Sequence, residues 1–467
     1  MPRLPDIPCY ANQRLETMKR EELKAIQFKM ALYRLEWAFA KSPFYRKKFK
    51  AAGITSIKDD IKSWDDFYKK VPFVDKAELV EDEVNHPPFG TKLTVPPEQI
   101  VHLSSTGGTS GQGAESFPMT KFEWSRWAAS AGGYWTGFYW SGLRKGGVSP
   151  AVFGMGISGG TRNMHESAVK AGALALVVGT YPTEEKLKYM KKYSMTWLYT
   201  LPSYLNVLAT TAEKLGMKPA EDFPRLQGIA VPGETFPINW AMRMEEVWNC
   251  KVNEFYGNTQ TGAIIAFCCE KGAVPNGKRG KMHLNEFDTL VEIINPDTNE
   301  HVRAGEDGEM VLTSFNKVAV PYIRYRTRDK ARYLPYTECD CGRTWDIIEA
   351  GSVGRLDDMI KIKGMNVWPQ AVEEVMFAHE VVDDFQAQIF TDEKSGQTNI
   401  IINIALKGKG LNYGKDEKSK LFAQITEDVR KKVGVGMKVQ EVLRSELPDA
   451  SEGYQKVRRF IDARKMS

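Results

Sequence analysis

The runs WLYTLPS (197–203) and LQGIAVPG (226–233) decide the fold class, because each is a short apolar stretch that ends in a proline or glycine turn. Two similar runs precede them, AVFGMG at 151–156 and ALALVVG at 173–179. Helix-forming sequence separates the runs, and buried strands that alternate with helices are typical of an α/β fold. We therefore expect mixed or largely parallel sheets flanked by helices.

The sequence on either side of these runs divides the chain into two parts. Residues 14–52 alternate charged and apolar side chains at a three-to-four spacing, which predicts helix. Antiparallel strands are expected at 290–294, 309–314 and 321–325, and a second pattern follows Gly354, with strands near 359–363 and at 399–406 and helices at 369–379 and 416–433. We predict a large N-terminal domain over residues 1–354 and a small, mobile α+β C-terminal domain over residues 355–467.

Composition excludes several classes of protein. The chain has 467 residues, 42% of them hydrophobic and 26% charged, with a formal net charge of +5, as in an ordinary globular protein. So small a net charge gives no indication of nucleic-acid or membrane-surface binding. No apolar run reaches the roughly 20 residues of a membrane helix, and the N-terminus lacks the apolar stretch of a secretory signal. We therefore expect a cytoplasmic protein with reduced thiols and neither nucleic-acid nor membrane partners.

The segment LSSTGGTSGQG, residues 103–113, is the first motif with a clear chemical meaning. Glycine lets backbone N–H groups approach an anion, and serine and threonine hydroxyls add donors, so the segment suits phosphate binding. A flexible linker is the alternative interpretation. The candidate residues are Ser104, Ser105, Thr106, Gly107, Gly108, Thr109, Ser110 and Gly111.

Further motifs follow in a fixed order, although each alone has an ordinary explanation as a turn, a solvated strand face or a basic tail. They are VPGETF (231–236), YGNTQTG (256–262), YIRYRTRDKARY (322–333), GRLDDMIKIKGMNVWPQAVEE (354–374) and SEGYQKVRRFID (451–462). Together with the Ser/Thr/Gly segment they make the chain resemble the adenylate-forming superfamily, specifically its phenylacetate–CoA ligase branch. The resemblance covers nearly the whole chain.

This resemblance implies a role for each motif. It assigns the Ser/Thr/Gly segment to ATP phosphates, Asp329 to both ribose hydroxyls, and Lys456 to a bridge between substrate carboxylate and α-phosphate. Arg355 lies beside the ribose acid, and Asp357 is the hinge about which the small domain rotates. Gly233, Glu234, Tyr256, Gly257 and Thr259 complete the implied nucleotide site. The chemistry agrees, because a carboxylate binds hydroxyl groups strongly and a lysine stabilises charge that develops at a phosphoryl centre.

Three positions depart from the family pattern. Gln260 replaces a glutamate that helps to hold Mg²⁺, and a neutral amide is a weaker ligand for a hard cation. Arg328 replaces a glycine next to Asp329, and Gly453 lies three residues before Lys456 instead of directly before it. We still expect ATP and Mg²⁺ as cofactors, with CoA as co-substrate.

The cysteines suggest a second metal site. Cys339 and Cys341 form a tight C-x-C-G turn, and Cys269 and His283 lie upstream. Some members of the ligase branch hold a structural zinc on three cysteines and a histidine from these regions, and this ligand set suits tetrahedral Zn²⁺. Cys268 is the competing first ligand, and buried free thiols are the alternative.

The acid that is activated is less well specified. The aromatic-rich segment 121–140 contains Tyr134, and the glycine-rich segment 154–173 places Arg162 and His165 near a turn. These residues could form an aryl-shaped wall or neutralise a polar substituent, and helix core and an exposed helix N-terminus are the alternative interpretations. The expected substrate is an aromatic carboxylic acid.

The predicted function is ATP-dependent ligation of that acid to CoA through an acyl-adenylate, with release of pyrophosphate and AMP. One alternative is an adenylating enzyme that loads a carrier protein or stops at the adenylate. Another, raised by Gln260 and Arg328, is a catalytically weak nucleotide-binding homologue. Because dimers are common in this branch, a homodimer is the default expectation.

Overall fold

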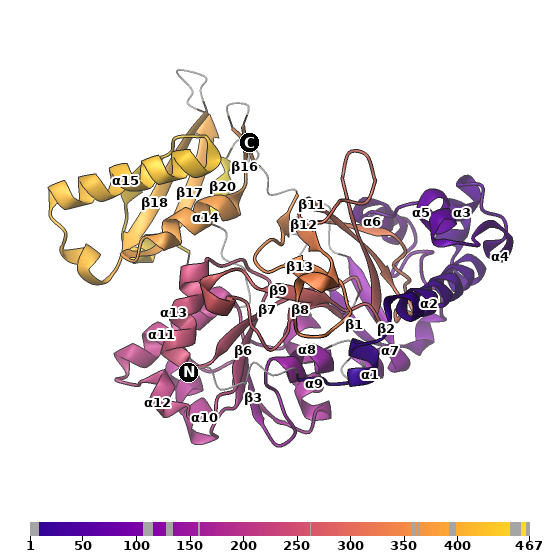
Figure 1. Ribbon diagram of the computed structural model, residues 1–467, viewed down its shortest axis with the longest axis horizontal. Coiled ribbons are helices and arrows are strands. Elements are labelled where there is room, and N and C mark those ends of the chain that lie inside the picture. The colour runs from indigo at the N-terminus through magenta and orange to yellow at the C-terminus, as the bar shows by residue number, and fades with distance from the viewer. Residues whose placement is uncertain are drawn as a thin grey trace.

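The computed structural model of the chain describes residues 9–105, 115–127, 134–156, 159–261, 263–356, 360–362, 365–391, 398–448 and 459–463. A ten-stranded sheet occupies the middle of the molecule in the order β10-β11-β12-β13-β9-β8-β7-β6-β5, with β14 paired to β12 (Figure 1). Its strands are β5 (Trp197–Tyr199), β6 (Gly228–Pro232), β7 (Lys251–Asn258), β8 (Ala263–Cys268), β9 (Lys281–Leu284), β10 (Thr289–Ile294), β11 (Asp307–Ser314), β12 (Tyr325–Leu334), β13 (Ile347–Glu349) and β14 (Gly354–Arg355).

This sheet is mixed, as expected. Strands β5, β6 and β7 run parallel, and the remaining pairings are antiparallel. The parallel part arises because helices connect its strands. These helices are α11 (Pro202–Lys214), α12 (Pro219–Asp222) and α13 (Ile238–Trp248). The α/β fold class is therefore confirmed.

Two smaller sheets lie beside it. Strands β1 (Ile100–Ser105) and β2 (Ser116–Thr120) pair antiparallel, and β3 (Val148–Ala151) pairs parallel with β4 (Leu174–Val177). Four helices accompany these strands: α7 (Lys121–Trp127), α8 (Tyr134–Trp140), α9 (Gly159–Lys170) and α10 (Thr183–Lys192). The Ser/Thr/Gly segment lies between β1 and β2 in the sequence.

The N-terminal region is helical, but residues 14–52 do not form one element. They divide into α1 (Gln13–Glu16), α2 (Arg20–Lys41) and α3 (Pro43–Ala51). The break after α2 has a local cause: Pro43 starts α3, and the Ser42 hydroxyl accepts a hydrogen bond from the Tyr45 N–H at 3.3 Å. Helices α4 (Ile57–Asp60), α5 (Trp64–Lys70) and α6 (Lys76–Asn85) complete this flank.

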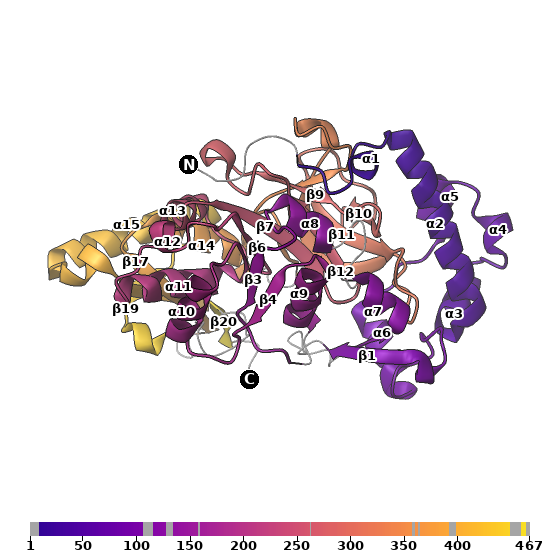
Figure 2. The same cartoon turned by 90° about the horizontal axis from the view of Figure 1, so that it is seen from below.

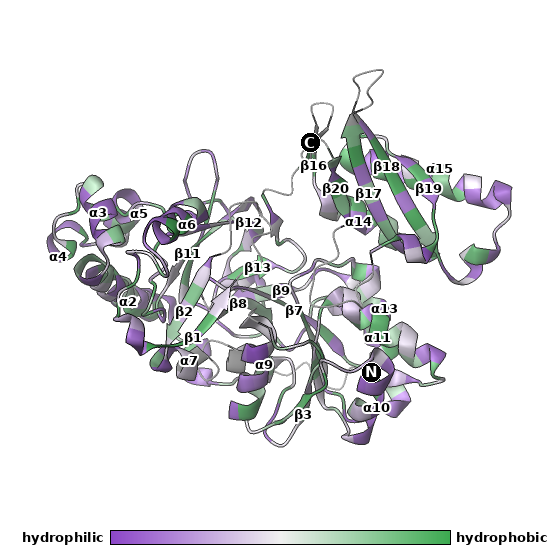
Figure 3. Ribbon diagram, turned by 180° about the vertical axis from the view of Figure 1, so that it is seen from behind, coloured by the Kyte–Doolittle hydropathy of each residue, from purple (hydrophilic) through white to green (hydrophobic). Residues whose placement is uncertain are grey.

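The C-terminal part contains a four-stranded sheet in the order β19-β18-β17-β20. The helices and strands of the C-terminal part are β15 (Ile360–Ile362), β16 (Met365–Val367), α14 (Pro369–Ala378), β17 (Val382–Thr391), β18 (Thr398–Leu406), α15 (Lys415–Val433), β19 (Lys438–Glu441) and β20 (Phe460–Asp462). Its buried apolar residues form a cluster of their own, from Ile360 to Val439. Figure 3 shows apolar residues along β17 and β18.

The N-terminal helices and the C-terminal sheet lie far apart. The helices α2 to α5 and the C-terminal sheet with α15 occupy opposite ends of the molecule in both views (Figures 1 and 2). The C-terminal part meets the central one where α14 packs against α13. That junction borders the site described next.

Candidate functional site

Asp329 is the centre of the first group of candidate residues. The hydroxyl of Tyr256 on β7 donates to Asp329 Oδ2 at 2.6 Å, and Arg355 Nη1 on β14 donates to Oδ1 at 2.9 Å. Arg355 also donates to the Thr327 carbonyl at 3.0 Å. Three expected residues from three strands therefore meet at one carboxylate, which keeps accepting capacity because each oxygen has two lone pairs.

The backbone before Asp329 explains how the carboxylate is presented. The β11–β12 ladder is irregular between Glu309 and Val311, and Arg328 adopts φ 60°, in the left-handed region. The Thr327 hydroxyl accepts a hydrogen bond from the Asp329 N–H at 2.9 Å. An ordinary side chain thus occupies a conformation that favours glycine, which agrees with glycine being usual at position 328 in the resembling family.

The surroundings of Tyr256 keep its phenol protonated. Burial and the neighbouring Asp329 carboxylate raise the pKa of Tyr256 well above its ordinary value. The phenol therefore remains a hydrogen-bond donor at all physiological pH values.

Gly233 and Glu234 follow strand β6. Gly233 has φ +80°, and the Glu234 carboxylate accepts hydrogen bonds from the Ser203 N–H and hydroxyl, each at 2.9 Å. Ser203 lies at the start of α11, so Glu234 anchors the N-terminal end of that helix.

The Ser/Thr/Gly segment begins at the end of β1. His102 Nε2 lies 3.0 Å from the Ser104 hydroxyl, and the register pairs Ser105 with Ser116 of β2. Burial, together with the positive charges of Arg162 and Lys317, lowers the pKa of His102 to about 4, so the imidazole is neutral at pH 7. Thr106, Gly107, Gly108, Thr109, Ser110 and Gly111 lie outside the described residues.

Sequence reasoning missed Glu115, which lies directly after this segment. Gln260 Nε2 donates to Glu115 Oε2 at 3.3 Å, and the Tyr322 hydroxyl donates to Oε1 at 2.9 Å. Glu115 is 0% exposed. Gln260, in the turn after β7, is therefore linked to the residue that directly precedes β2.

These donors do not fit a magnesium ion held by protein carboxylates. Mg²⁺ is usually bound through one or two carboxylates together with substrate phosphates. Here residue 260 is an amide, a weaker ligand for a hard cation than a carboxylate, and the neighbouring Glu115 is fully buried within the protein.

The predicted acyl-pocket residues lie on two helices, α8 and α9. Tyr134 starts α8, and its side chain is outside the described set. Arg162 lies on α9, where its charge acts on His102, whereas His165 Nδ1 lies 3.5 Å from Glu166 Oε1. Asp357 and Lys456 also lie outside the described residues.

The cysteines and histidine form a compact cluster. The possible ligand atoms of Cys269, His283, Cys339 and Cys341 lie within 4.8 Å of one another, and all four residues are buried. His283 Nε2 is 3.4 Å from Cys341 Sγ, while Nδ1 is 3.3 Å from the Trp345 carbonyl. Hydrogen bonds from Cys269 and Cys339 lower the pKa of Cys341 below its usual range.

This donor set fits Zn²⁺. Three sulfur atoms and one imidazole nitrogen are the ligands of closed tetrahedral sites. A ligating histidine ordinarily donates its second ring N–H to a backbone carbonyl, which is the position of Trp345 O here. A metal in this cluster would have a structural role and no open position for a substrate.

Residues beside the cluster fasten the N-terminus, and we call Tyr10, Glu16 and Arg343 the N-terminal clasp. The guanidinium of Arg343 donates to Glu16 Oε2 at 3.0 Å and to Glu270 Oε2 at 2.8 Å. The Tyr10 hydroxyl donates to the Cys341 carbonyl at 3.1 Å. The clasp thus connects the first helices to the loop that carries two of the cysteines.

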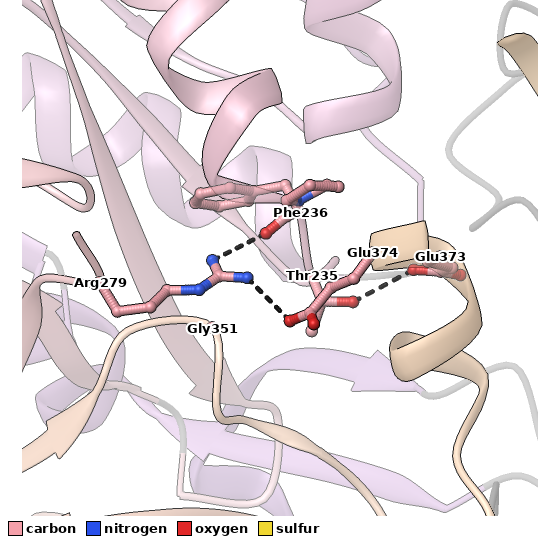
Figure 4. Close-up of a pocket in the computed structure, with 7 residues that line it drawn as sticks. Thr235, Phe236, Arg279, Gly351, Glu373 and Glu374 are labelled. Carbon is pink, nitrogen blue, oxygen red and sulfur yellow. Dashed lines mark hydrogen bonds and ion pairs between the residues drawn. The ribbon is translucent and has the colours of Figure 1, made fainter. Parts of the chain in front are cut away.

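A pocket lies where the C-terminal part meets the large one (Figure 4). The Thr235 hydroxyl donates to Glu373 Oε2 at 3.3 Å, and Arg279 donates to Glu374 Oε1 at 3.2 Å and to the Phe236 carbonyl at 2.8 Å. Thr235 directly follows Glu234. The contact between the two parts is therefore adjacent to a predicted site residue.

No helix in the described part of the chain is long and apolar enough to cross a membrane.

The chain is similar over nearly its full length to known CoA ligases. Phenylacetate–coenzyme A ligase of Thermus thermophilus is 27% identical over 464 residues, which cover 97% of this chain and 99% of the relative. The enzyme of the same name from Escherichia coli K12 is 28% identical over 460 residues, covering 96% and 97%. A crystal structure of 2-hydroxyisobutyryl-CoA ligase shares the fold, with a TM-score of 0.85 and 22% identity over 99% of this chain and 94% of that one.

Two family matches cover more than half of the chain. Residues 148–319 match the AMP-binding enzymes, and residues 364–464 match the C-terminal domain of AMP-binding enzymes. The chain therefore belongs to the AMP-binding enzyme family.

Proposed function

We propose that this protein is an AMP-forming acid–CoA ligase that acts on an aromatic carboxylic acid. The meeting of Tyr256 and Arg355 at Asp329 carries the proposal, because it presents one carboxylate between a phenol and a guanidinium. Near full-length similarity to phenylacetate–coenzyme A ligases supports the aromatic substrate. In this scheme Asp329 accepts the ribose hydroxyls of ATP, and the Ser/Thr/Gly segment binds the phosphates.

The reaction has two steps. A carboxylate oxygen of the acid attacks the α-phosphorus of ATP, and the bond to pyrophosphate breaks, which gives an acyl-adenylate. The sulfur of CoA then attacks the acyl carbonyl, the thiol proton passes to solvent, and AMP leaves. Activation is required because a carboxylate is a poor electrophile. Positioning and charge stabilisation supply most of the catalysis of such phosphoryl chemistry.

Chain residues contribute positioning and charge. Lys456, placed by resemblance, stabilises the charge that develops between the carboxylate and the α-phosphorus. Mg²⁺ would enter bound to the phosphates of ATP.

We further infer that residues 1–354 and 355–467 are separate domains, because the buried apolar cluster from Ile360 to Val439 is distinct from the clusters of the large part. Rotation near Asp357 would let one site serve both steps.

The test is release of AMP and pyrophosphate from ATP with a panel of aromatic mono- and dicarboxylic acids, with and without CoA. We expect thioester formation that depends on CoA and on one aryl acid. Pyrophosphate release without a thioester would instead indicate transfer to a carrier protein. Lys456→Ala should block the first step and leave conversion of supplied acyl-adenylate largely intact, and equal loss of both steps would contradict its assignment.

A further inference from the structure

Glu115 is a buried carboxylate that connects two of the motifs. It ends the Ser/Thr/Gly connection between β1 and β2, and its Oε2 accepts from Gln260 of the YGNTQTG turn at 3.3 Å. Its Oε1 accepts from Tyr322 at 2.9 Å, just before β12. The strand that leads into the YGNTQTG turn also carries Tyr256, which donates to Asp329. The Glu115 side chain thus connects the start of β2 to the turn after β7, the strand that contacts Asp329.

Burial raises the pKa of Glu115, and the charge of Lys92 together with the hydrogen bonds from Tyr322 and Gln260 opposes that rise. Lys92 Nζ is 4.0 Å from Glu115 Oε1, and it also contacts Glu83 Oε2 at 2.9 Å and the Leu79 carbonyl at 3.1 Å. Lys76 and the buried Lys317 act on it at longer range. A buried carboxylate persists only when such charges and hydrogen bonds compensate its lost hydration.

Chemistry then fixes what residue 260 can be. An ionised carboxylate only accepts hydrogen bonds, so the amide of Gln260 must present its NH₂ group to Glu115. A second carboxylate at position 260 would put two anions side by side inside the protein, which is strongly unfavourable. The pair therefore accommodates one acid and one amide.

We propose that Glu115 is a positioning residue for the nucleotide, and that it acts with Gln260 as a hydrogen-bonded acid–amide pair. The pair joins Glu115, which follows the phosphate segment in the sequence and directly precedes β2, to Gln260 after β7. This inference rests on the proposed function, because it takes the Ser/Thr/Gly segment to bind ATP phosphates. It also explains why an amide at position 260 is compatible with an intact site.

The experiment is a double-mutant cycle with Glu115→Gln, Gln260→Glu and the exchanged variant that carries both changes. ATP affinity is measured by calorimetry without acid or CoA, and KM for ATP and kcat are measured in the full reaction. We expect each single change to weaken ATP binding about tenfold, the usual effect of losing a hydrogen bond to a charged group. The exchanged variant should recover to within about threefold, since it restores one acid and one amide.

Glu123→Gln is the matched control. Glu123 is also a buried carboxylate that accepts backbone hydrogen bonds, from Val318 at 2.7 Å and Ala319 at 3.1 Å. This control should lower thermal stability without the rise in KM for ATP. If it raised KM as much as Glu115→Gln does, the effect would belong to any buried acid in this region, and the proposal would be wrong.

Two further results separate the possible failures. If the losses of ATP affinity in the two single variants simply add in the exchanged variant, Glu115 and Gln260 do not act as a pair. That result would leave ATP binding by the wild type, and hence the proposed function, intact. Wild type that binds no ATP would overturn the proposed function itself. If a buried variant fails to fold, Gln260→Ala tests the same link at a partly exposed position, and unchanged ATP affinity there would refute the proposal.

Discussion

At the scale of single residues, Asp329 has contacts that fix both its position and its electrostatic surroundings. It accepts from Tyr256 and Arg355, and it follows Arg328, whose φ of 60° is unusual for a non-glycine residue. Position and charge are therefore both set by neighbours on other strands. Substitutions here should change binding more than folding.

We predict that Asp329→Asn weakens ATP binding about tenfold or more, because the amide loses the charge opposite Arg355 and one of its two accepting oxygens. Calorimetric titration with ATP measures the change. Asp307→Asn is the control, since Asp307 pairs with Arg332 at 2.8 Å on the neighbouring strand, outside the site. Equal losses in the two variants would contradict the role of Asp329.

Gly351 gives a second prediction at this scale. Its φ is +75°, its N–H donates to Glu254 at 2.6 Å, and an added Cβ would lie 2.4 Å from Arg279 Nη1. Gly53 has nearly the same φ, +79°, with nothing within 4 Å of an added Cβ.

Gly53→Ala should therefore cost about 1 kcal/mol from backbone strain alone. Gly351→Ala should cost at least about 1 kcal/mol more, because Arg279 must also move. Urea unfolding of the two variants measures the difference. Equal costs would mean that Arg279 moves freely and that its contacts with Phe236 and Glu374 are weak.

At the scale of elements, α14 makes the contact with the large part of the molecule. Glu373 keeps some exposed surface, yet protein atoms surround its carboxylate closely enough that burial raises its pKa to about 7. Arg459 opposes this shift, whereas the acidic neighbours Glu234 and Asp384 reinforce it. The contact between Thr235 and Glu373 is therefore sensitive to pH.

The sign of the effect follows from the raised pKa. A glutamate freed from the contact titrates near 4.5, so the contacting state binds more protons, and its stability falls as the pH rises from about 4.5 to about 7. Energy transfer between dyes on Val84→Cys and Leu411→Cys, two exposed positions, measures the separation. Glu373→Gln should remove the pH dependence in this range, and an unchanged profile would contradict the prediction.

Elements with strong local signals were predictable from sequence. The helix expected at 416–433 is α15, Lys415–Val433, because Gly434 ends it in the left-handed conformation and apolar residues recur along one face. The strand expected at 321–325 instead begins at Tyr325. Arg324 has φ 43°, and the Ile323 N–H bonds to the distant Tyr45 hydroxyl. Such a tertiary contact has no local sequence signal.

At the scale of the whole molecule, the cysteine cluster joins segments some 70 residues apart. We predict one zinc ion per chain, measured by metal analysis of the purified protein. Cys269→Ser should abolish zinc binding, whereas Cys268→Ser should retain it, because Cys268 is the buried neighbour that lies outside the cluster. Zinc lost from Cys268→Ser and kept by Cys269→Ser would reverse this assignment.

The site was predictable only where motifs identify residues one by one. The resemblance assigned Tyr256, Asp329 and Arg355 to one nucleotide site, and Cys269, His283, Cys339 and Cys341 to one metal site. Glu115 was not predictable, because a single glutamate after a glycine-rich segment forms no pattern and its partner Gln260 lies 145 residues away. Arg279 and Glu373 were missed for the same reason, since their importance arises only where α14 meets the large part.

The N-terminal clasp has a consequence for synthesis of the chain. Arg343, which binds Glu16, leaves the ribosome 327 residues after it. At about 5–20 residues per second, the interval is roughly 15–65 s. During that time α1 has no guanidinium to neutralise its carboxylate and no loop to cover it. Helix α1 thus docks long after its own synthesis, and until then it is accessible to chaperones and proteases.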